Sequence, residues 1–311
     1  MDWLGAGGPL IATRAIHFAA TAITAGTVVF RMVVAAPVLH AEAAVAEAFR
    51  ARTRRGAWIG LLVAMASGMI WLLLETASMS GRPFGDVQML STVLSETQFG
   101  QVTEIRLGLA VVLAASLAYG RLGGADWLAF AVALGLVASL AWTGHAGATA
   151  GEAGNLHVAA DALHLCAAAA WIGGLLSLIL FFATVRRTQR STCAPLVLWA
   201  TRRFSIVGIV SVAGLSVTGA VNAYFLVGSL QGLLVTEYGR LLILKLVVFA
   251  IMLALAAINR LWLTPRLALS DAGALRGLSR NSAIEFALGL VVVLMVGMLG
   301  TLHPAIHLVG P

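Results

Sequence analysis

Six of the seven histidines in the chain lie inside or beside four of its apolar segments, where polar side chains are costly to bury. They are His17, His145, His157, His164, His303 and His307. A neutral imidazole carries a nitrogen lone pair that binds transition metals or haem iron. If these segments are helices that bring the six side chains to one end of a bundle, the sequence predicts a metal or cofactor site there.

The strongest single pattern is the stretch NLHVAADALH, in which His157, Asp161 and His164 occupy positions i, i+4 and i+7. This spacing places all three on one face of a helix. The carboxylate could bind a metal between the two imidazoles, or accept a ring N–H and so fix a histidine tautomer. The alternative is an aspartate at a helix start, with two histidines bonded to nearby backbone.

The other four histidines come from three further segments. His303 and His307 flank Pro304 at the end of the last apolar segment, and we expect the helix to bend at this proline. His145 closes the segment before the NLHVAADALH stretch, and His17 lies about two turns into the first segment. Each of them alone could be structural, so the hypothesis depends on their convergence at one depth.

The composition excludes a soluble domain of this size. The 311 residues are 60% hydrophobic and 11% charged, with a mean hydropathy of +0.96. Eight stretches are long enough to span a bilayer: 10–36, 56–78, 103–120, 127–144, 158–184, 204–228, 239–259 and 285–303. We therefore predict an all-α, polytopic bundle of eight transmembrane helices in a single domain, 1–311, with shorter interfacial helices in 79–102 and 228–238.

The arginines orient this bundle. The four loops after odd-numbered spans hold 14 of the 20 basic residues: Arg50, Arg52, Arg54, Arg55, Arg121, Arg186, Arg187, Arg190, Arg202, Arg203, Arg260, Arg266, Arg276 and Arg280. The opposite loops and both termini hold only Arg82. The positive-inside rule then makes both termini and the six histidines extracytoplasmic, and His40 a cytoplasmic loop residue. Because most of the basic charge lies in loops between spans, we expect no nucleic-acid partner.

Other polar and soft side chains also lie within the spans. The pairs Met65 with Met69 and Met295 with Met298 each share a helix face, and thioethers suit Cu(I), although such pairs more often fill a core. Ion pairs should offset the cost of charges at similar depths within the spans: Arg14, Arg106, Arg240 and Lys245 with Glu75, Glu104, Asp161 and Glu237.

Several motifs occur in a characteristic order. Asp161-Ala-Leu-His164 followed by Trp171-Ile-Gly-Gly174 resembles the central signature of the CopD (PcoD-like) family of bacterial copper-resistance membrane proteins. Further similar stretches are 203–223, 238–246, the Asn259-Arg260 pair and the segment from Glu285 to His307. The resemblance is strongest over 143–311. It implies an eight-span inner-membrane protein of copper homeostasis, whose copper-associated histidines map onto His145, His157, His164, His303 and His307.

The expected function is copper transport across the bacterial inner membrane, with the outer histidines capturing the ion and uptake slightly favoured over export. The resemblance implies a periplasmic, CopC-type copper-binding protein as a possible partner. We expect a transporter and not an enzyme. Because no P-loop is evident, any active transport would be driven by an ion gradient or by copper's own gradient. Two alternatives stay open: a membrane redox protein that binds copper or a single haem, with His17 and His164 as axial ligands, and a metal-binding sensor or assembly protein without transport.

Overall fold

A computed structural model describes residues 7–40, 42–120, 124–188, 193–269 and 272–309, and every regular element in these ranges is a helix. The eight long helices carry the bundle: α1 (Gly7–Phe30), α3 (Ala43–Ser80), α5 (Gln98–Ala118), α6 (Ala125–Ala138), α7 (Gly151–Thr188), α8 (Cys193–Leu226), α10 (Glu237–Ile258) and α12 (Ala272–Leu299). Each of them, α6 together with the 3-10 turn that follows it, is long and apolar enough to cross a membrane. The predicted eight-span, all-α fold is confirmed to this extent.

Several helices extend well beyond the predicted spans. Helices α3 and α7 have 38 residues each, or about 57 Å at 1.5 Å per residue, against a hydrocarbon core of about 30 Å. A hydropathy window detects only the apolar part of such a helix, whereas backbone hydrogen bonding continues into the polar part. The arginine-bearing stretch 50–55 is accordingly the first part of α3 and not a loop.

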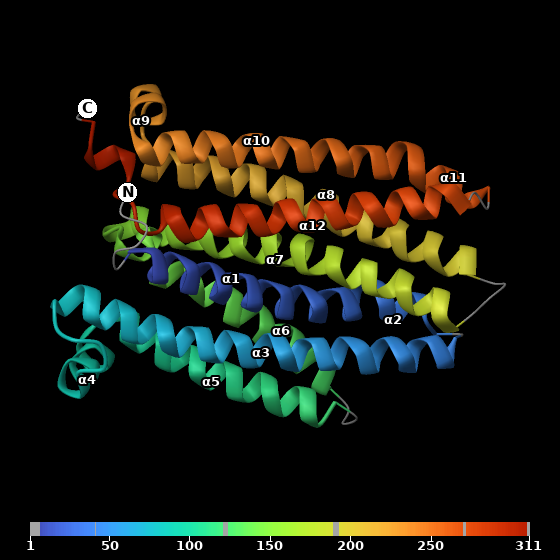
Figure 1. The fold of residues 1–311 in the computed structure, drawn as a ribbon, viewed down its shortest axis with the longest axis horizontal. Coiled ribbons are helices and arrows are strands. Elements are labelled where there is room, and N and C mark those ends of the chain that lie inside the picture. Colours follow the sequence, from blue (N-terminus) through green and yellow to red (C-terminus); the bar gives the residue numbers. More distant parts are fainter. Residues whose placement is uncertain (1–6, 41, 121–123, 189–192, 270–271, 310–311) are drawn as a thin grey trace.

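The long helices run roughly along one axis and alternate in direction, so the start of α1 and the end of α12 lie at the same end of the bundle (Figure 1). That end also carries α4 (Val87–Glu96), α9 (Leu230–Val235) and the 3-10 turns His145–Ala148 and Ala305–His307. We call it the histidine end. The arginine end carries α2 (Ala36–Val38) and α11 (Thr264–Ala268). Arg121 and Arg190 lie outside the described residues.

Helix α7 lies at the centre of the bundle, packed against α1, α8 and α12. A Cβ atom added to Gly173 would lie only 2.8 Å from the Cα of Gly26, so the α1 and α7 backbones are in direct contact. The aromatic side chains of Phe30, Phe49 and Phe181 form an apolar core toward the arginine end. The close approach at Gly173 fixes α7 against α1.

Two π-helical turns interrupt the long helices shortly before a proline. They are η1 (Arg31–Ala35), before Pro37, and η4 (Asn259–Leu263), before Pro265. Proline has no N–H and cannot continue the α-helical hydrogen-bond pattern, and a π-turn absorbs the mismatch. At η4 the hydroxyl of Thr264 donates to the Asn259 carbonyl at 2.7 Å, which fixes the position of Asn259.

The last span ends earlier than predicted. Helix α12 ends at Leu299, whereas the sequence placed the bend at Pro304. The chain then forms hydrogen-bonded turns over 300–302 and a 3-10 turn over Ala305–His307, with Pro304 as its N-cap. Both predicted interfacial helices are present, as α4 and α9, each capped by a side-chain oxygen, from Asp86 and Ser229 respectively.

Candidate metal centre at the histidine end

The predicted ligands separate into three groups. His145, His157 and His303 lie together near the surface of the histidine end, where His145 interacts electrostatically with both of the others. Asp161 and His164 lie deeper on α7. Because seven residues of helix separate His157 from His164, the two differ in depth by about 10 Å. The prediction of one common depth is therefore only partly right.

His157 is the most completely enclosed of these side chains, with 1% of its surface exposed. Its ring stacks on Phe225 of α8 at a centroid distance of 4.7 Å, and its Nδ1 lies 2.8 Å from the Thr149 hydroxyl oxygen. That hydroxyl also lies 3.4 Å from the His145 carbonyl and donates to it, so the Nδ1–H of His157 donates to Thr149. The Nε2 atom is buried and has no partner among the described residues.

This unpartnered nitrogen is informative because buried polar atoms nearly always have a hydrogen-bond partner. In the tautomer just described, Nε2 carries a lone pair, which is the form that binds a metal. The site therefore presents a preoriented ligand atom that no described residue of the protein satisfies.

His145 stands between His157 and the exposed residues. Its Nε2–H donates to the Leu299 carbonyl at the end of α12, at 3.3 Å, which leaves Nδ1 as the lone-pair nitrogen. Burial lowers the pKa of His145 from its ordinary value of 6.5, so the neutral, metal-binding form persists to lower pH. His303 and His307 are exposed. His303, His145 and His157 thus form a series from the surface to the buried Nε2 of His157.

The deeper group is organised by α8. The Thr218 hydroxyl donates to the Gly214 carbonyl at 2.6 Å, so the Nδ1–H of His164 donates to Thr218 at 2.9 Å. This tautomer again leaves Nε2 with its lone pair. The Asn222 amide donates to Asp161 at 2.9 Å, and the Asn222 carbonyl oxygen is buried without a partner in the described part of the chain.

Lys245 of α10 interacts electrostatically with both Asp161 and His164. The positive charge balances the Asp161 carboxylate inside the bundle. It also opposes a metal ion at His164 unless that ion is accompanied by negative charge.

His17 belongs to a third group, built by α1, α3 and α5. Its Nδ1–H donates to the Ala64 carbonyl at 2.9 Å, and its Nε2 accepts from Arg106 at 2.6 Å. Arg106 also donates to the Leu136 carbonyl and to Ser139. Both ring nitrogens of His17 are thus engaged, so binding of copper or haem iron at His17 stays a prediction that requires these bonds to break.

The predicted ion pairs form in part. Arg14 lies 4.0 Å from Glu75 and stacks over the Trp71 ring at 5.0 Å. Arg240 instead donates to the Leu234 carbonyl. The sequence reasoning missed Thr149, Thr218 and Phe225, because no pattern within α7 reveals which side chains face it. The spacing of Thr218 and Asn222, one turn apart on one face of α8, could have suggested partners for His164 and Asp161.

No group of three or more His, Cys, Asp or Glu side chains within the described ranges lies close enough to hold a metal ion. The histidine end therefore carries open ligand atoms, not a closed cage. A bound ion would need His303, His307 or an outside ligand to complete its coordination.

Comparison with known proteins decides the family. The family model "Copper resistance protein D" matches residues 198–299, and "Copper resistance protein D-like, N-terminal domain" matches residues 3–155. Copper resistance protein D of Pseudomonas syringae pv. tomato is 31% identical over 279 residues, which are 82% of this chain and 84% of that protein. The chain belongs to the copper resistance protein D family. The resemblance inferred from the sequence is confirmed.

Two further proteins are similar to this chain. Inner membrane protein YebZ of Escherichia coli (strain K12) is 33% identical over 53% of this chain and 55% of its own length. Copper transport protein CutJ of Bacillus subtilis (strain 168) is 29% identical over 94% of this chain and 52% of its own length. The chain thus spans about half the length of these two relatives. No solved structure gives a significant match.

Proposed function

We propose that this protein carries copper across the bacterial inner membrane, with its histidine end on the extracytoplasmic side. The observation that supports this most directly is the buried, unpartnered Nε2 of His157 in a member of a copper resistance family. An imidazole lone pair held without a protein partner is a ligand for a soft or borderline metal such as copper.

The histidines define a path for the ion. Copper first meets the exposed His303 and His307, then the half-buried His145, and then the buried His157. His164 lies about 10 Å further along α7 and presents the next free nitrogen. Each step replaces water by an imidazole, so the ion loses its hydration gradually and does not cross into the bundle in one costly step.

Of the two methionine pairs, only the pair on α12 can extend this path into the bundle. Met295 of α12 is buried, whereas Met65 and Met69 of α3 are 36% and 55% exposed on the outside of the bundle. The α3 pair therefore faces the surroundings of the bundle, and a thioether relay would have to use Met295 and its neighbour Met298. Met252 of α10 is also buried and belongs to the same apolar core as Met295.

The proposed cycle moves an ion and is not enzymatic. Uptake is favoured slightly over export, because the open ligands lie at the proposed outer face. A periplasmic, CopC-type copper-binding protein would deliver copper to the exposed His303 and His307. The orientation is tested by reporter fusions: those after Arg55 and Arg276 should behave as cytoplasmic, and one after Ala150 as external. External activity after Arg276 would invert the path.

The decisive experiment is copper flux in proteoliposomes, measured in both directions together with bound copper and the absorbance spectrum. We expect flux and bound copper, both strongly reduced in His157→Ala and unchanged in His40→Ala, because His40 is exposed beyond the last turn of α2. Bound copper without flux would indicate a sensor or assembly protein. A haem Soret band in the purified protein would indicate a redox protein.

A further inference from the structure

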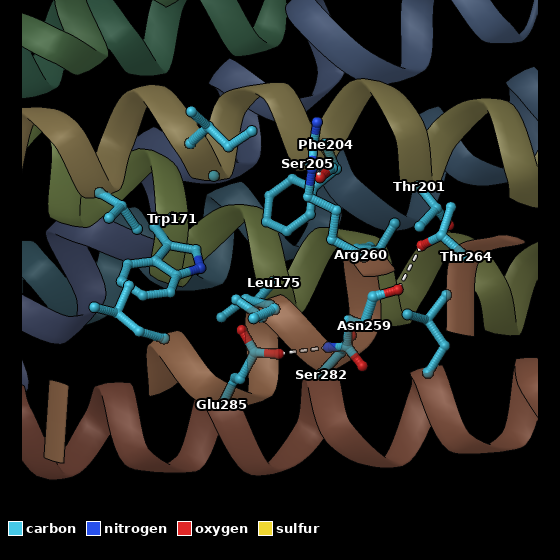
Figure 2. A pocket seen from close by; sticks show the side chains of 18 of the residues that line it. Trp171, Leu175, Thr201, Phe204, Ser205, Asn259, Arg260, Thr264, Ser282 and Glu285 are labelled. Carbon is cyan, nitrogen blue, oxygen red and sulfur yellow. Dashed lines mark hydrogen bonds between the residues drawn. The ribbon is translucent and has the colours of Figure 1, made fainter. Parts of the chain in front are cut away.

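The half of the bundle toward the arginine end contains a cavity of about 380 Å³ that the copper path does not reach. Helices α7, α8, α10 and α12 line it, together with η4 and α11, and it is open on one side, where Ile209 and Arg260 are exposed. Figure 2 shows its wall, which is apolar around Trp171, Leu175 and Phe204 and polar around Asn259 and Glu285. Among the described residues, Glu285 is the only carboxylate in this lining.

Glu285 is held in place by a chain of amides. Its side chain is 2% exposed, and its Oε1 accepts from the Asn259 amide at 2.6 Å. The Asn259 carbonyl oxygen in turn accepts from Asn281 at 3.0 Å, which fixes the direction of the Asn259 amide. The π-turn η4 and the bond from Thr264 hold the Asn259 backbone (Figure 2). The carboxyl group is thus rigidly positioned by residues from three elements.

No cation lies within ion-pair distance of Glu285 in the part of the chain that the structure describes. Arg260 is the other titratable residue of the lining, and its guanidinium donates to Ser205 of α8 at 2.6 Å. Within the described ranges, α7 and α8 contribute no titratable side chain to the cavity wall, and α12 contributes only Glu285. An unpaired carboxylate in an apolar cavity is costly, so a cation must bind it for much of the time.

The chemistry of the wall selects a proton over a metal ion. The second oxygen of Glu285, Oε2, has no hydrogen-bond partner among the described residues, and the Asn259 carbonyl oxygen is already used. One carboxyl oxygen cannot replace the four to eight ligands that metal ions require. A proton needs only that oxygen.

We propose that Glu285 is a proton-binding site that couples copper movement to the proton gradient. This rests on the proposed transport function and adds its energy source. Protonation forms one O–H bond on the carboxylate and breaks none in the protein, and deprotonation returns the proton to water. The exposed Arg260 at the cavity wall marks the side from which water reaches it. The neutral carboxyl group stands in a low-polarity wall, whereas the ionised group relies on the Asn259 amide alone.

The test uses Glu285→Gln, which is nearly isosteric, permanently uncharged and still able to accept from Asn259. With wild-type protein in liposomes, a transmembrane pH gradient should shift the steady-state copper ratio by up to about tenfold per pH unit for one proton per ion. In Glu285→Gln the ratio should not respond, although copper affinity stays unchanged. Glu104→Gln, an exposed carboxylate on α5, is the matched control and should respond as wild type does.

A second measurement covers the case in which Glu285→Gln does not fold. Glu285→Asp keeps a titratable carboxyl group and should keep the response to the gradient, and infrared difference spectra of wild-type protein after a pH jump should show a buried carboxyl group titrating. A wild-type ratio that ignores the gradient, an unchanged response in Glu285→Gln, or no titrating carboxyl band would each overturn the proposal. Absence of copper flux in wild-type protein under all conditions would instead overturn the transport function itself.

Discussion

Two polar groups at the histidine end contain the same kinds of side chain but differ in burial and in how completely they are bonded. The first, between α1, α3 and α5, consists of Arg14, His17, Glu75 and Arg106. The second, between α7, α8 and α10, consists of Asp161, His164, Asn222 and Lys245. In the first, both nitrogens of His17 have partners, and Arg14 Nε is the one buried atom of the group that lacks a partner among the described residues.

The second group is open. His164 uses only Nδ1, and the Asn222 carbonyl oxygen has no partner among the described residues. His157, about two turns away on α7, presents an unpartnered Nε2. The difference teaches that residue type and depth do not separate a structural histidine from a ligand. A structural histidine differs from a ligand in the number of ring nitrogens that the protein itself satisfies, because a metal can bind only a nitrogen that has no other partner.

The largest effect on stability is expected from removing the central histidine of the first group. His17→Ala removes the partner of Arg106 Nη2 and of the Ala64 carbonyl, and leaves a cavity beside Trp71. We expect a loss of about 3–5 kcal/mol in stability, seen as a large drop in melting temperature in detergent. Copper affinity of the folded fraction should not change. A loss of affinity without a loss of stability would place His17 in the metal site and erase the contrast between the two groups.

The matching change in the second group is His164→Ala. Copper affinity should fall by about 100-fold or more, roughly 2.8 kcal/mol, since a ligand is lost and not merely an orienting group. The melting temperature without metal should change little, because the Thr218 hydroxyl keeps its bond to the Gly214 carbonyl. Isothermal titration or competition with a chelator measures the affinity. An effect no larger than that of His40→Ala would remove His164 from the path.

Asp161→Asn sharpens the comparison further. The substitution keeps the shape but removes the negative charge beside Lys245 and the charged acceptor of the Asn222 amide. We expect a stability loss of about 1–3 kcal/mol with copper affinity nearly unchanged. The double variant Asp161→Asn with Lys245→Met should recover part of that loss. If affinity falls by about 10–100-fold at constant stability, Asp161 acts on the metal or on an imidazole instead.

The smallest effect concerns pH. Burial lowers the pKa of His145 in the folded protein, so the unfolded chain takes up this proton first as pH falls. The contribution of His145 to stability is therefore complete above its ordinary pKa of 6.5 and is lost below it. In His145→Gln, the melting temperature should fall less between about pH 7.5 and about pH 5.5 than in wild-type protein. An identical fall of the melting temperature in both proteins would contradict a lowered pKa of His145.

The sequence predicted the eight spans and the end of the bundle that carries the histidines, because both follow from hydropathy and the distribution of arginine. It could not predict which histidine is free. Thr149 lies eight residues before His157, and Thr218 lies on another helix, so their bonds depend on tertiary packing. The same holds for Glu285, whose partner Asn259 is brought into place by a π-turn that no hydropathy pattern reveals.

The backbone contact between Gly26 and Gly173 has a consequence for motion. Helix α7 carries both His157 and His164 and also lines the Glu285 cavity through Trp171, yet it is locked to α1 along this contact. In the apolar 18-residue stretch of α7, 56% of the residues are buried inside the bundle, against 22% for α8 and 11% for α10. We therefore expect the α1–α7 pair to move as one rigid unit. Helix α8 packs closely on α7, whereas α10 packs mainly on α12. A bulky residue at position 173 would push α7, with His157 and His164, away from α1.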